Sequence, residues 1–250
     1  MIAVLVLSLF PGLGLLDLAF EEAGFTIVRG PDLLWGGDVR RFHPPAGKFD
    51  GVIGGPPCQI HSRMRHLNPR AGERHGDLIP EFVRVVSEAG PQWFLMENVP
   101  EAPVPSVLGY LIEPRLLRDV WVGGETSRLR RFTFGALERA RFEIATLALH
   151  RTDPTPAVLA GGGGRSQPVR FGGSGKRKKP RSGPSSGPRA TIAELLAAQG
   201  LPGDWLDDSP LTVEGQRKGI GNGVPLPMGR AVAAAVKGAI GMLDSHIPKE

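Results

Sequence analysis

Residues 49–59 read FDGVIGGPPCQ. The first five are typical of a short buried strand, and the two glycines and two prolines that follow impose a rigid, non-helical turn. Cys58 stands at the end of this turn and is the only cysteine in the 250 residues. Because open α/β sheets place their chemistry at the carboxyl ends of strands, we interpret Cys58 as a candidate reactive thiol. The alternative is a small apolar core residue.

The residues before this stretch predict a strand, a glycine turn, a helix and a second strand. They cover residues 2–9, 10–14, 15–23 and 25–28 in that order. The G-x-G of the turn would let backbone amides approach a ligand at the start of the helix. Asp17 stands where a dinucleotide-binding loop has its third glycine, which disfavours a nicotinamide-dependent dehydrogenase.

Two aspartates follow the second strand. Asp32 stands eighteen residues after Gly14, near the spacing at which an acid takes ribose hydroxyls, and Asp38 lies in the next turn. Either could be an ordinary turn residue. Since both fall at the same edge of the predicted sheet as the glycine turn, they favour a nucleotide-like ligand there.

Residues 60–76 are polar and rich in arginine and histidine, and we interpret them as a mobile active-site loop. A metal site of Cys58, His61 and His66 is disfavoured because no second ligand pair matches it. A Cys–His hydrolase with one of these histidines as base is conceivable, although sequence neighbours seldom pair in this way.

A helix with Asp77 as N-cap and Gly90 as its end precedes a predicted buried strand over residues 92–96. This strand ends in Glu97. Burial of a carboxylate at the end of a central strand costs free energy, which favours a functional role for Glu97. The alternative is a salt-bridged core acid.

The second half predicts fewer regular elements. Residues 101–118 suggest a proline-rich segment with one short helical run, and residues 120–122 and 144–149 suggest strands. Arg128, Arg130 and Phe132 alternate as in a strand that leaves a loop. A capping box at residues 191–194 opens a helix through Gln199. Residues 219–225 lead into an alanine-rich helix that we expect to pack on the sheet near the first strand.

The composition allows one large domain, alone or with a small appendage, because 250 residues with 41% hydrophobic content can fill a core. A single cysteine excludes an internal disulfide framework and indicates a reducing compartment, which we expect to be the cytoplasm. Residues 1–10 lack the basic start and cleavage site of a signal peptide. No apolar run reaches the roughly 18 residues of a membrane span.

The net charge of +5 is unevenly distributed. Residues 154–193 contain eight Arg or Lys residues and no Asp or Glu, so the rest of the chain is net negative. Such local basicity predicts contact with a polyanion, and the alternative is a solvated tail or loop. Glycine, proline and serine dominate residues 151–189, where we expect little fixed structure without a partner.

Six short motifs, taken in order along the chain, resemble those of the cytosine-C5 DNA methyltransferase family. They are residues 10–14 (FPGLG), 55–59 (GPPCQ), 97–99 (ENV), 128–130 (RLR), 199–202 (QGLP) and 221–225 (GNGVP). The resemblance covers residues 1–150 and 189–242 and is closest to the small bacterial or phage type. Each motif alone has weak or moderate specificity, whereas six in the family's order are a strong signal.

The resemblance implies transfer of a methyl group from S-adenosylmethionine to C5 of cytosine in double-stranded DNA, as in restriction–modification. Cys58 would attack C6 of a flipped-out cytosine, and Glu97 would hydrogen-bond N3 and the exocyclic amine. Arg130 would hold O2, with Arg128 in the same motif. The residues that would bind the cofactor are Phe10, Gly12, Leu13, Gly14, Asp32, Asp38, Val39, Pro56, Leu78, Asn222 and Val224. We expect no metal, no membrane contact and a monomer.

The sequence departs from the family's pattern in several places. Thr126 stands where the arginine motif usually begins with glutamine, His61 where an apolar residue is usual, and Pro31 where an acid is common. The target-recognition region, a substantial domain in the family, is reduced to about forty residues of low complexity. Because phosphate contacts carry no sequence information directly, we expect a short target of roughly two to four nucleotides.

We therefore expect an α/β fold with a doubly wound, mostly parallel sheet and the catalytic residues along one edge. Residues 1–150 would bind cofactor and carry catalysis, 151–188 would be the reduced recognition segment, and 189–250 would add the last motifs and a helix that packs back. Two alternatives stay open: the same chemistry on RNA such as tRNA, and a DNA- and cofactor-binding protein with little or no turnover.

Overall fold

The computed structural model describes residues 4–57, 76–147, 157–158 and 190–244. Within these residues, six strands form one sheet in the order β2-β1-β3-β4-β6-β5. The strands are β1 (Leu5–Leu9), β2 (Thr26–Arg29), β3 (Gly51–Gly54), β4 (Trp93–Asn98), β5 (Leu111–Arg118) and β6 (Leu129–Ala136). The pairs β1–β2, β1–β3 and β3–β4 are parallel, whereas β6 is antiparallel to both β4 and β5. The mostly parallel sheet predicted from the sequence is confirmed.

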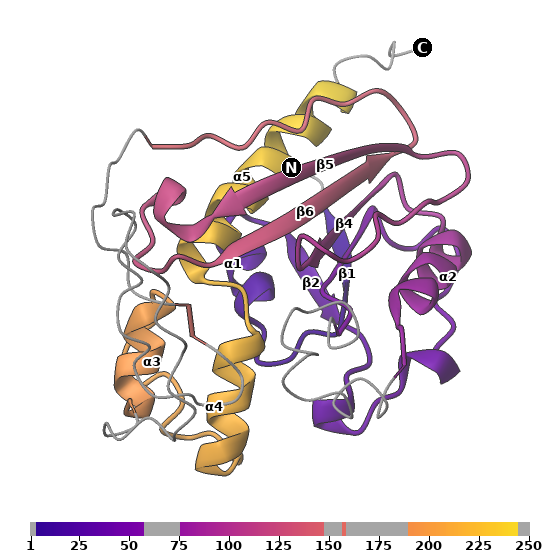
Figure 1. Ribbon diagram of the computed structural model, residues 1–250. Helices are drawn as coiled ribbons and strands as arrows, with labels where there is room; N and C mark the ends of the chain where they lie inside the picture. Colours follow the sequence, from indigo (N-terminus) through magenta and orange to yellow (C-terminus); the bar gives the residue numbers. More distant parts are fainter. Residues whose placement is uncertain (1–3, 58–75, 148–156, 159–189, 245–250) are drawn as a thin grey trace, which may run out of the picture.

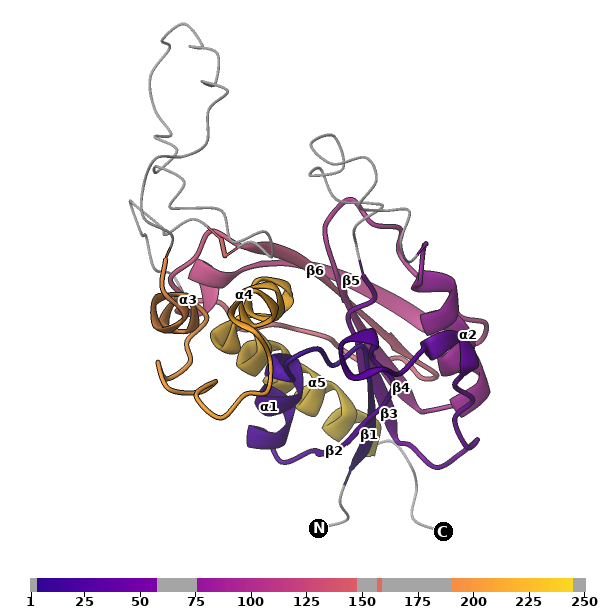
Figure 2. The same ribbon diagram turned by 90° about the horizontal axis from the view of Figure 1, so that it is seen from below.

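Helices cover both faces of this sheet (Figure 1). α1 (Leu15–Glu22) and α5 (Leu226–Asp244) pack on one face, and α2 (Ile79–Ala89) packs on the other. α3 (Ile192–Ala198) and α4 (Val213–Asn222) lie side by side beyond α1, where Leu196 and Ile220 share a buried cluster with Leu15 (Figure 2). The fold is therefore doubly wound, as expected.

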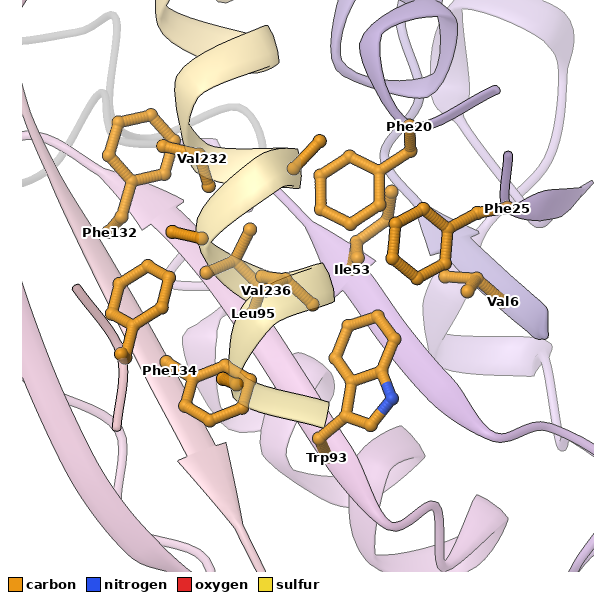
Figure 3. Close-up of a cluster of buried hydrophobic side chains, with 14 of the residues drawn as sticks. Val6, Phe20, Phe25, Ile53, Trp93, Leu95, Phe132, Phe134, Val232 and Val236 are labelled. Carbon is orange, nitrogen blue, oxygen red and sulfur yellow. The ribbon is translucent and has the colours of Figure 1, made fainter. Parts of the chain in front are cut away.

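The core between the sheet and α5 is built around aromatic rings (Figure 3). The ring of Trp93 in β4 stacks between Phe20 of α1 and Phe134 of β6, with centroid distances of 6.4 and 6.3 Å. Gly51 of β3 has no Cβ, and the indole of Trp93 fills the space that one would need. Each such buried side chain stabilises the fold by roughly 1.5–3 kcal/mol. These contacts fix β3, β4 and β6 relative to one another, and the site lies at the ends of these strands.

The elements predicted for the first hundred residues agree with the structure. The predicted strands at residues 2–9, 25–28, 49–53 and 92–96 correspond to β1 to β4, and residues 15–23 to α1. One local detail differs. Asp77 accepts a hydrogen bond from the Ile79 amide at 3.0 Å, but Leu78 is the N-cap of α2.

Three predictions for the second half are wrong. Residues 111–118 form the edge strand β5 and no helical run, because an edge strand tolerates Pro114 where a central strand would lose a hydrogen bond. Residues 120–122 lie in a 3₁₀ helix, η5 (Asp119–Val122), and not in a strand. Residues 144–147, the described part of the last predicted strand, are not in a strand.

Three helices complete this half. α3 begins with the predicted capping box, in which Thr191 and Glu194 each bond the other's backbone amide. α4 was not predicted from the sequence. α5 packs on the sheet near β1, as expected, since Val6 shares its buried cluster.

The sheet topology brings three turns to one edge. β1, β3 and β4 are parallel, so the residues after each strand emerge on the same side. β6 runs the other way and starts at that edge, with Arg131 opposite Asn98 at the end of β4. The glycine turn, the Gly55-Pro56-Pro57 turn and the end of β4 therefore meet there, together with the start of β6.

Candidate active site

The glycine turn after β1 is held from two sides by the segment after β2. The Gly12 amide donates to Asp32 Oδ2 at 2.8 Å, and the indole N–H of Trp35 donates to the Gly12 carbonyl at 2.8 Å. Phe10, with φ +57°, is the one non-glycine residue of the described chain in the left-handed region. Nothing described lies within 4 Å of a Cβ built on Gly12, so the turn borders open space.

Helix α1 begins at this turn without a side-chain cap. Gly14 is its N-cap, with φ +80°, and its amide donates to the Pro11 carbonyl at 2.7 Å. The free N–H groups at a helix start carry partial positive charge and suit an anionic or polar ligand group. Leu13, the residue between the two glycines, packs against α4 at Gly219, where its side chain fills the space of a Cβ.

A buried carboxylate lies beneath the turn. Asp17 of α1 accepts from the hydroxyl of Ser8 at 2.5 Å and pairs with Arg29 Nε at 3.0 Å. Burial raises the pKa of Asp17, and the bonds from Ser8 and Arg29 offset part of that effect. The residue that replaces the third glycine of a dinucleotide loop thus ties α1 to β1 and β2.

The two aspartates predicted to bind a ligand both cap short 3₁₀ helices. Asp32 Oδ1 accepts from the Leu34 amide at 2.7 Å at the start of η1 (Leu33–Trp35). Asp38 caps η2 (Val39–Arg41), and its hydrogen bonds to Arg40 lower the pKa of its carboxyl to about 2. Val39 is buried in the cluster under α2.

Trp35 is a site residue that the sequence reasoning missed. Its side chain is 53% exposed although its N–H is bonded to the glycine turn. The available signal was an aromatic residue three positions after Asp32, inside a segment bounded by glycines.

The turn that leads to Cys58 is joined to the end of β4. Pro56 is buried, and its carbonyl accepts from Asn98 Nδ2 at 3.2 Å. A Cβ on Gly55 would lie 2.9 Å from Glu97 Oε2, so the Glu97 carboxylate lies directly against this turn. Cys58 itself, with His61 and His66, lies outside the described residues. Leu78 is buried at the start of α2.

Glu97 and Arg130 form an ion pair at the centre of the edge. Arg130 Nε lies 2.9 Å from Glu97 Oε1, and the side chains are only 18% and 11% exposed. Arg130 also donates to the Leu129 carbonyl at 2.8 Å. A cation and a carboxylate at adjacent strand ends, one turn from Cys58, could together hold a polar ring.

The structure separates the two arginines of the RLR motif. Arg128 is 2% exposed and donates to the carbonyls of Gly221 at 2.9 Å, Asn222 at 3.3 Å and Val158 at 3.2 Å. The carbonyls of Gly221 and Asn222 lie at the C-terminal end of α4, where the helix dipole favours a cation. Arg128 thus lies against α4, whereas Arg130 lies against Glu97.

The last two motifs pack under the glycine turn. The side chain of Leu15 fills the space of a Cβ on Gly223, and Gln199 Nε2 donates to the Ile220 carbonyl at 2.8 Å. Asn222 is exposed at the end of α4, and Val224 is buried in the sheet core. The glycines of residues 219–223 therefore permit the close approach of α4 to the residues after β1.

Known proteins resemble the part of the chain that contains this site. A model described as C-5 cytosine-specific DNA methylase matches residues 36–103, which include the Gly55 turn and Glu97. The type II methyltransferase M.NgoPII of Neisseria gonorrhoeae is 34% identical over 112 residues, 38% of this chain and 33% of that protein.

Across these residues the chain is similar to C-5 cytosine-specific DNA methylases.

Other proteins match over different lengths. The type II methyltransferase M.HindV of Haemophilus influenzae is 28% identical over 182 residues, 60% of this chain and 59% of that protein. The chain spans about a third of the length of M.NgoPII. The methyltransferase EhMeth of Entamoeba histolytica has the same fold, with a TM-score of 0.64 at 13% identity over 97% of this chain and 99% of that chain.

Two features are absent from the described residues. No helix in that part of the chain is long and apolar enough to cross a membrane. Nor do three His, Cys, Asp or Glu side chains gather there in a way that could hold a metal ion.

Proposed function

We propose that the chain transfers a methyl group from S-adenosylmethionine to C5 of cytosine in DNA, through a covalent bond between Cys58 and C6 of the base. The observation that carries the proposal is the Glu97–Arg130 pair, which lies against the Gly55-Pro56-Pro57 turn that ends at Cys58. The similarity to C-5 cytosine-specific DNA methylases over residues 36–103 supports the same reaction. The match with M.NgoPII covers 33% of that protein.

The edge beside this pair fits the cofactor of the family, which is S-adenosylmethionine. The open side of Gly12 and the uncapped start of α1 would receive its methionine part, and Asp32 would reach the ribose hydroxyls. The exposed indole of Trp35 would face the adenine, with Asp38 and Val39 along its edge. When bound, the cofactor supplies a methyl group on a positively charged sulfur.

Seven further residues complete the proposed cofactor surface: Phe10, Leu13, Gly14, Pro56, Leu78, Asn222 and Val224. Three of them differ in their exposure to solvent. Asn222 is exposed at the end of α4 and could donate to a ligand directly. Val224 and Leu78 are buried in the two cores and would shape the site from beneath.

The chemistry requires a nucleophile, an acid and a cation, and the chain offers one of each. C5 of cytosine is a poor nucleophile until a thiolate adds to C6, when electron density moves from the C5–C6 bond towards N3 and O2. Glu97 would hydrogen-bond N3, and Arg130 would stabilise negative charge at O2. Once C5 carries the methyl group, loss of its proton restores the ring and expels the Cys58 thiolate.

Access to the base would require the cytosine to leave the helix, at a cost of a few kcal/mol. We propose that the eight basic residues between 154 and 193 contact the phosphate backbone and help to hold the DNA. Their composition supplies charge without a set of rigid base-reading side chains, in keeping with a short target.

The test is direct product analysis. The pure protein is incubated with S-adenosylmethionine and unmethylated duplex DNA, with tRNA in parallel, and the digested nucleosides are measured by mass spectrometry. The proposal predicts 5-methylcytosine in DNA, and bisulfite sequencing of the same sample would give the target. Product in tRNA alone would keep the mechanism and change the substrate. No product in either, with cofactor binding intact, would reject the proposed activity for this chain alone.

A further inference from the structure

The turn between β5 and β6 is closed by a buried carboxylate. Asp119 is completely buried, and its Oδ2 accepts from both the amide of Thr126 at 2.9 Å and the hydroxyl of Thr126 at 2.7 Å. Thr126 is itself 1% exposed. The Asp119 carboxylate also fills the space that a Cβ on Gly124 would need, so residue 124 has room only for glycine.

Backbone bonds close the same turn. The Asp119 amide donates to the Arg128 carbonyl at 3.0 Å, and the Gly124 amide donates to the Asp119 carbonyl at 2.9 Å. The hydroxyl of Thr126 accepts from the Arg128 amide at 3.4 Å. Since Arg118 pairs with Leu129 and Leu117 with Arg130, the position of this turn fixes where β6 begins. Arg130 is two residues from Arg128, so any shift of the turn moves the guanidinium relative to Glu97.

The side chain of Arg128 extends the connection to the cofactor side. Its guanidinium holds the carbonyls of Gly221 and Asn222 at the end of α4. α4 in turn packs on Leu13 of the glycine turn through Gly219. One turn therefore supports both the cation beside Glu97 and the helix beneath the glycine turn.

We propose that Asp119 and Thr126 are positioning residues that hold Arg130 in register with Glu97, and that this buried pair takes the place of the glutamine with which the arginine motif of the family usually begins. In the described residues the hydrogen bonds of Thr126 go to Asp119 and Arg128, so Thr126 acts on Arg130 through the turn and not by direct contact with Glu97. The Asp119–Thr126 pair thus accounts for a motif that departs from the family's pattern and still presents its second arginine to Glu97. The expected change in kcat rests on the proposed function. The expected change in the structure of the turn rests on geometry alone.

Three variants test the pair. Thr126→Val keeps the shape of the side chain and removes the hydroxyl, Thr126→Ser keeps the hydroxyl, and Gly124→Ala displaces the Asp119 carboxylate without changing either partner. Small misplacements of a reacting group cost up to about 100-fold in rate, so we expect kcat to fall about 10- to 100-fold in Thr126→Val and Gly124→Ala. Thr126→Ser is expected to stay within about threefold of the wild type because it keeps the hydroxyl that bonds the carboxylate.

The decisive comparison is between rate and binding. We expect the dissociation constant for S-adenosylmethionine to change far less than kcat in Thr126→Val, because the hydrogen bonds that join Gly12 to Asp32 and Trp35 do not involve this turn. A Thr126→Val enzyme with wild-type kcat, or one whose loss is not rescued in Thr126→Ser, would overturn the proposal.

A second measurement does not depend on methyl transfer. Hydrogen exchange of the amides of residues 128–132 is expected to be faster in Thr126→Val and Gly124→Ala than in the wild type and Thr126→Ser. Equal exchange in all four proteins would overturn the proposal even if the wild type had no activity. Absence of 5-methylcytosine in the wild type, with the expected exchange pattern, would instead reject the proposed function and keep the positioning role.

Discussion

The contact between Gly55 and Glu97 makes a quantitative prediction. A Cβ on residue 55 would lie 2.9 Å from Glu97 Oε2, whereas ordinary contacts begin at 3.4 Å. In Gly55→Ala the carboxylate must therefore move by about 0.5 Å. The contact is with the end of a side chain and not with backbone, so the fold can absorb the change. The ion pair between Glu97 and Arg130 cannot keep its present geometry.

We therefore expect Gly55→Ala to separate stability from activity. Overpacking of this kind costs roughly 1–3 kcal/mol at a rigid core site and less beside a side chain that can turn. Displacement of Glu97, the proposed catalytic acid, is expected to lower kcat by about 10- to 100-fold. Thermal melting and methyl transfer under saturating substrate measure the two effects on one preparation.

A matched control is available in α5. A Cβ on Gly238 has nothing described within 4 Å, so Gly238→Ala adds the same methyl group to the chain without a steric contact. It should melt at or above the wild-type temperature, since alanine favours a helix over glycine by roughly 1 kcal/mol, and it should keep full activity. Wild-type kcat in Gly55→Ala would refute the assignment of Glu97 to the reaction, and a loss shared by Gly238→Ala would show that the effect is not local.

Three other predictions concern the cofactor side, the buried acid and the basic segment. Trp35→Ala should weaken S-adenosylmethionine binding about tenfold, which is about 1.4 kcal/mol, with kcat at saturating cofactor little changed; unchanged affinity by calorimetry would remove Trp35 from the site. Because burial raises the pKa of Asp17, its contribution to stability is present below its unfolded pKa of about 3.9 and is lost as pH rises through the higher folded value. The melting temperature of the wild type should therefore fall relative to Asp17→Asn as the pH rises above about 4, and a constant difference would contradict the burial argument. Deletion of residues 161–188 should weaken DNA binding and flatten its dependence on salt, whereas an unchanged salt slope would show that this segment is not the phosphate contact.

The parallel half of the fold could be read from the sequence because its signals are local. Apolar runs with glycine or proline at their ends gave β1 to β4, and helical spacing gave α1, α2 and α5. The placement of Glu97 at a strand end followed from the same pattern. Each of these elements carries its own apolar or helical pattern, so the local pattern and the tertiary packing agree.

The antiparallel half could not be read in this way. Pro114 argues against a strand in general, and only the position of β5 at the sheet edge makes it acceptable. α4 contains Gly215, Gly219 and Gly221, which disfavour a helix by propensity, and close packing on Leu13 outweighs that preference. In both cases a tertiary contact decides, and single-sequence patterns do not contain it.

The arginine motif illustrates the same limit within the site. Alternation along a strand placed Arg128 and Arg130 on one face, but β6 begins only at Leu129. The side chain of Arg128 therefore follows the turn and reaches α4, while Arg130 reaches Glu97. The spacing identified both arginines as candidate site residues. It could not show that they contact different partners.

The central claim is that the thiol of Cys58 bonds to C6 of the base during methyl transfer. Duplex DNA with 5-fluorocytosine at the target tests it, because C5 then receives the methyl group but has no proton to lose, and the bond to sulfur cannot be released. Peptide mapping after denaturation is predicted to find the nucleotide attached at Cys58, with one added methyl group, and no adduct in Cys58→Ser. Methylation of ordinary DNA without an adduct on the fluorinated DNA, or an adduct that persists in Cys58→Ser, would contradict the account.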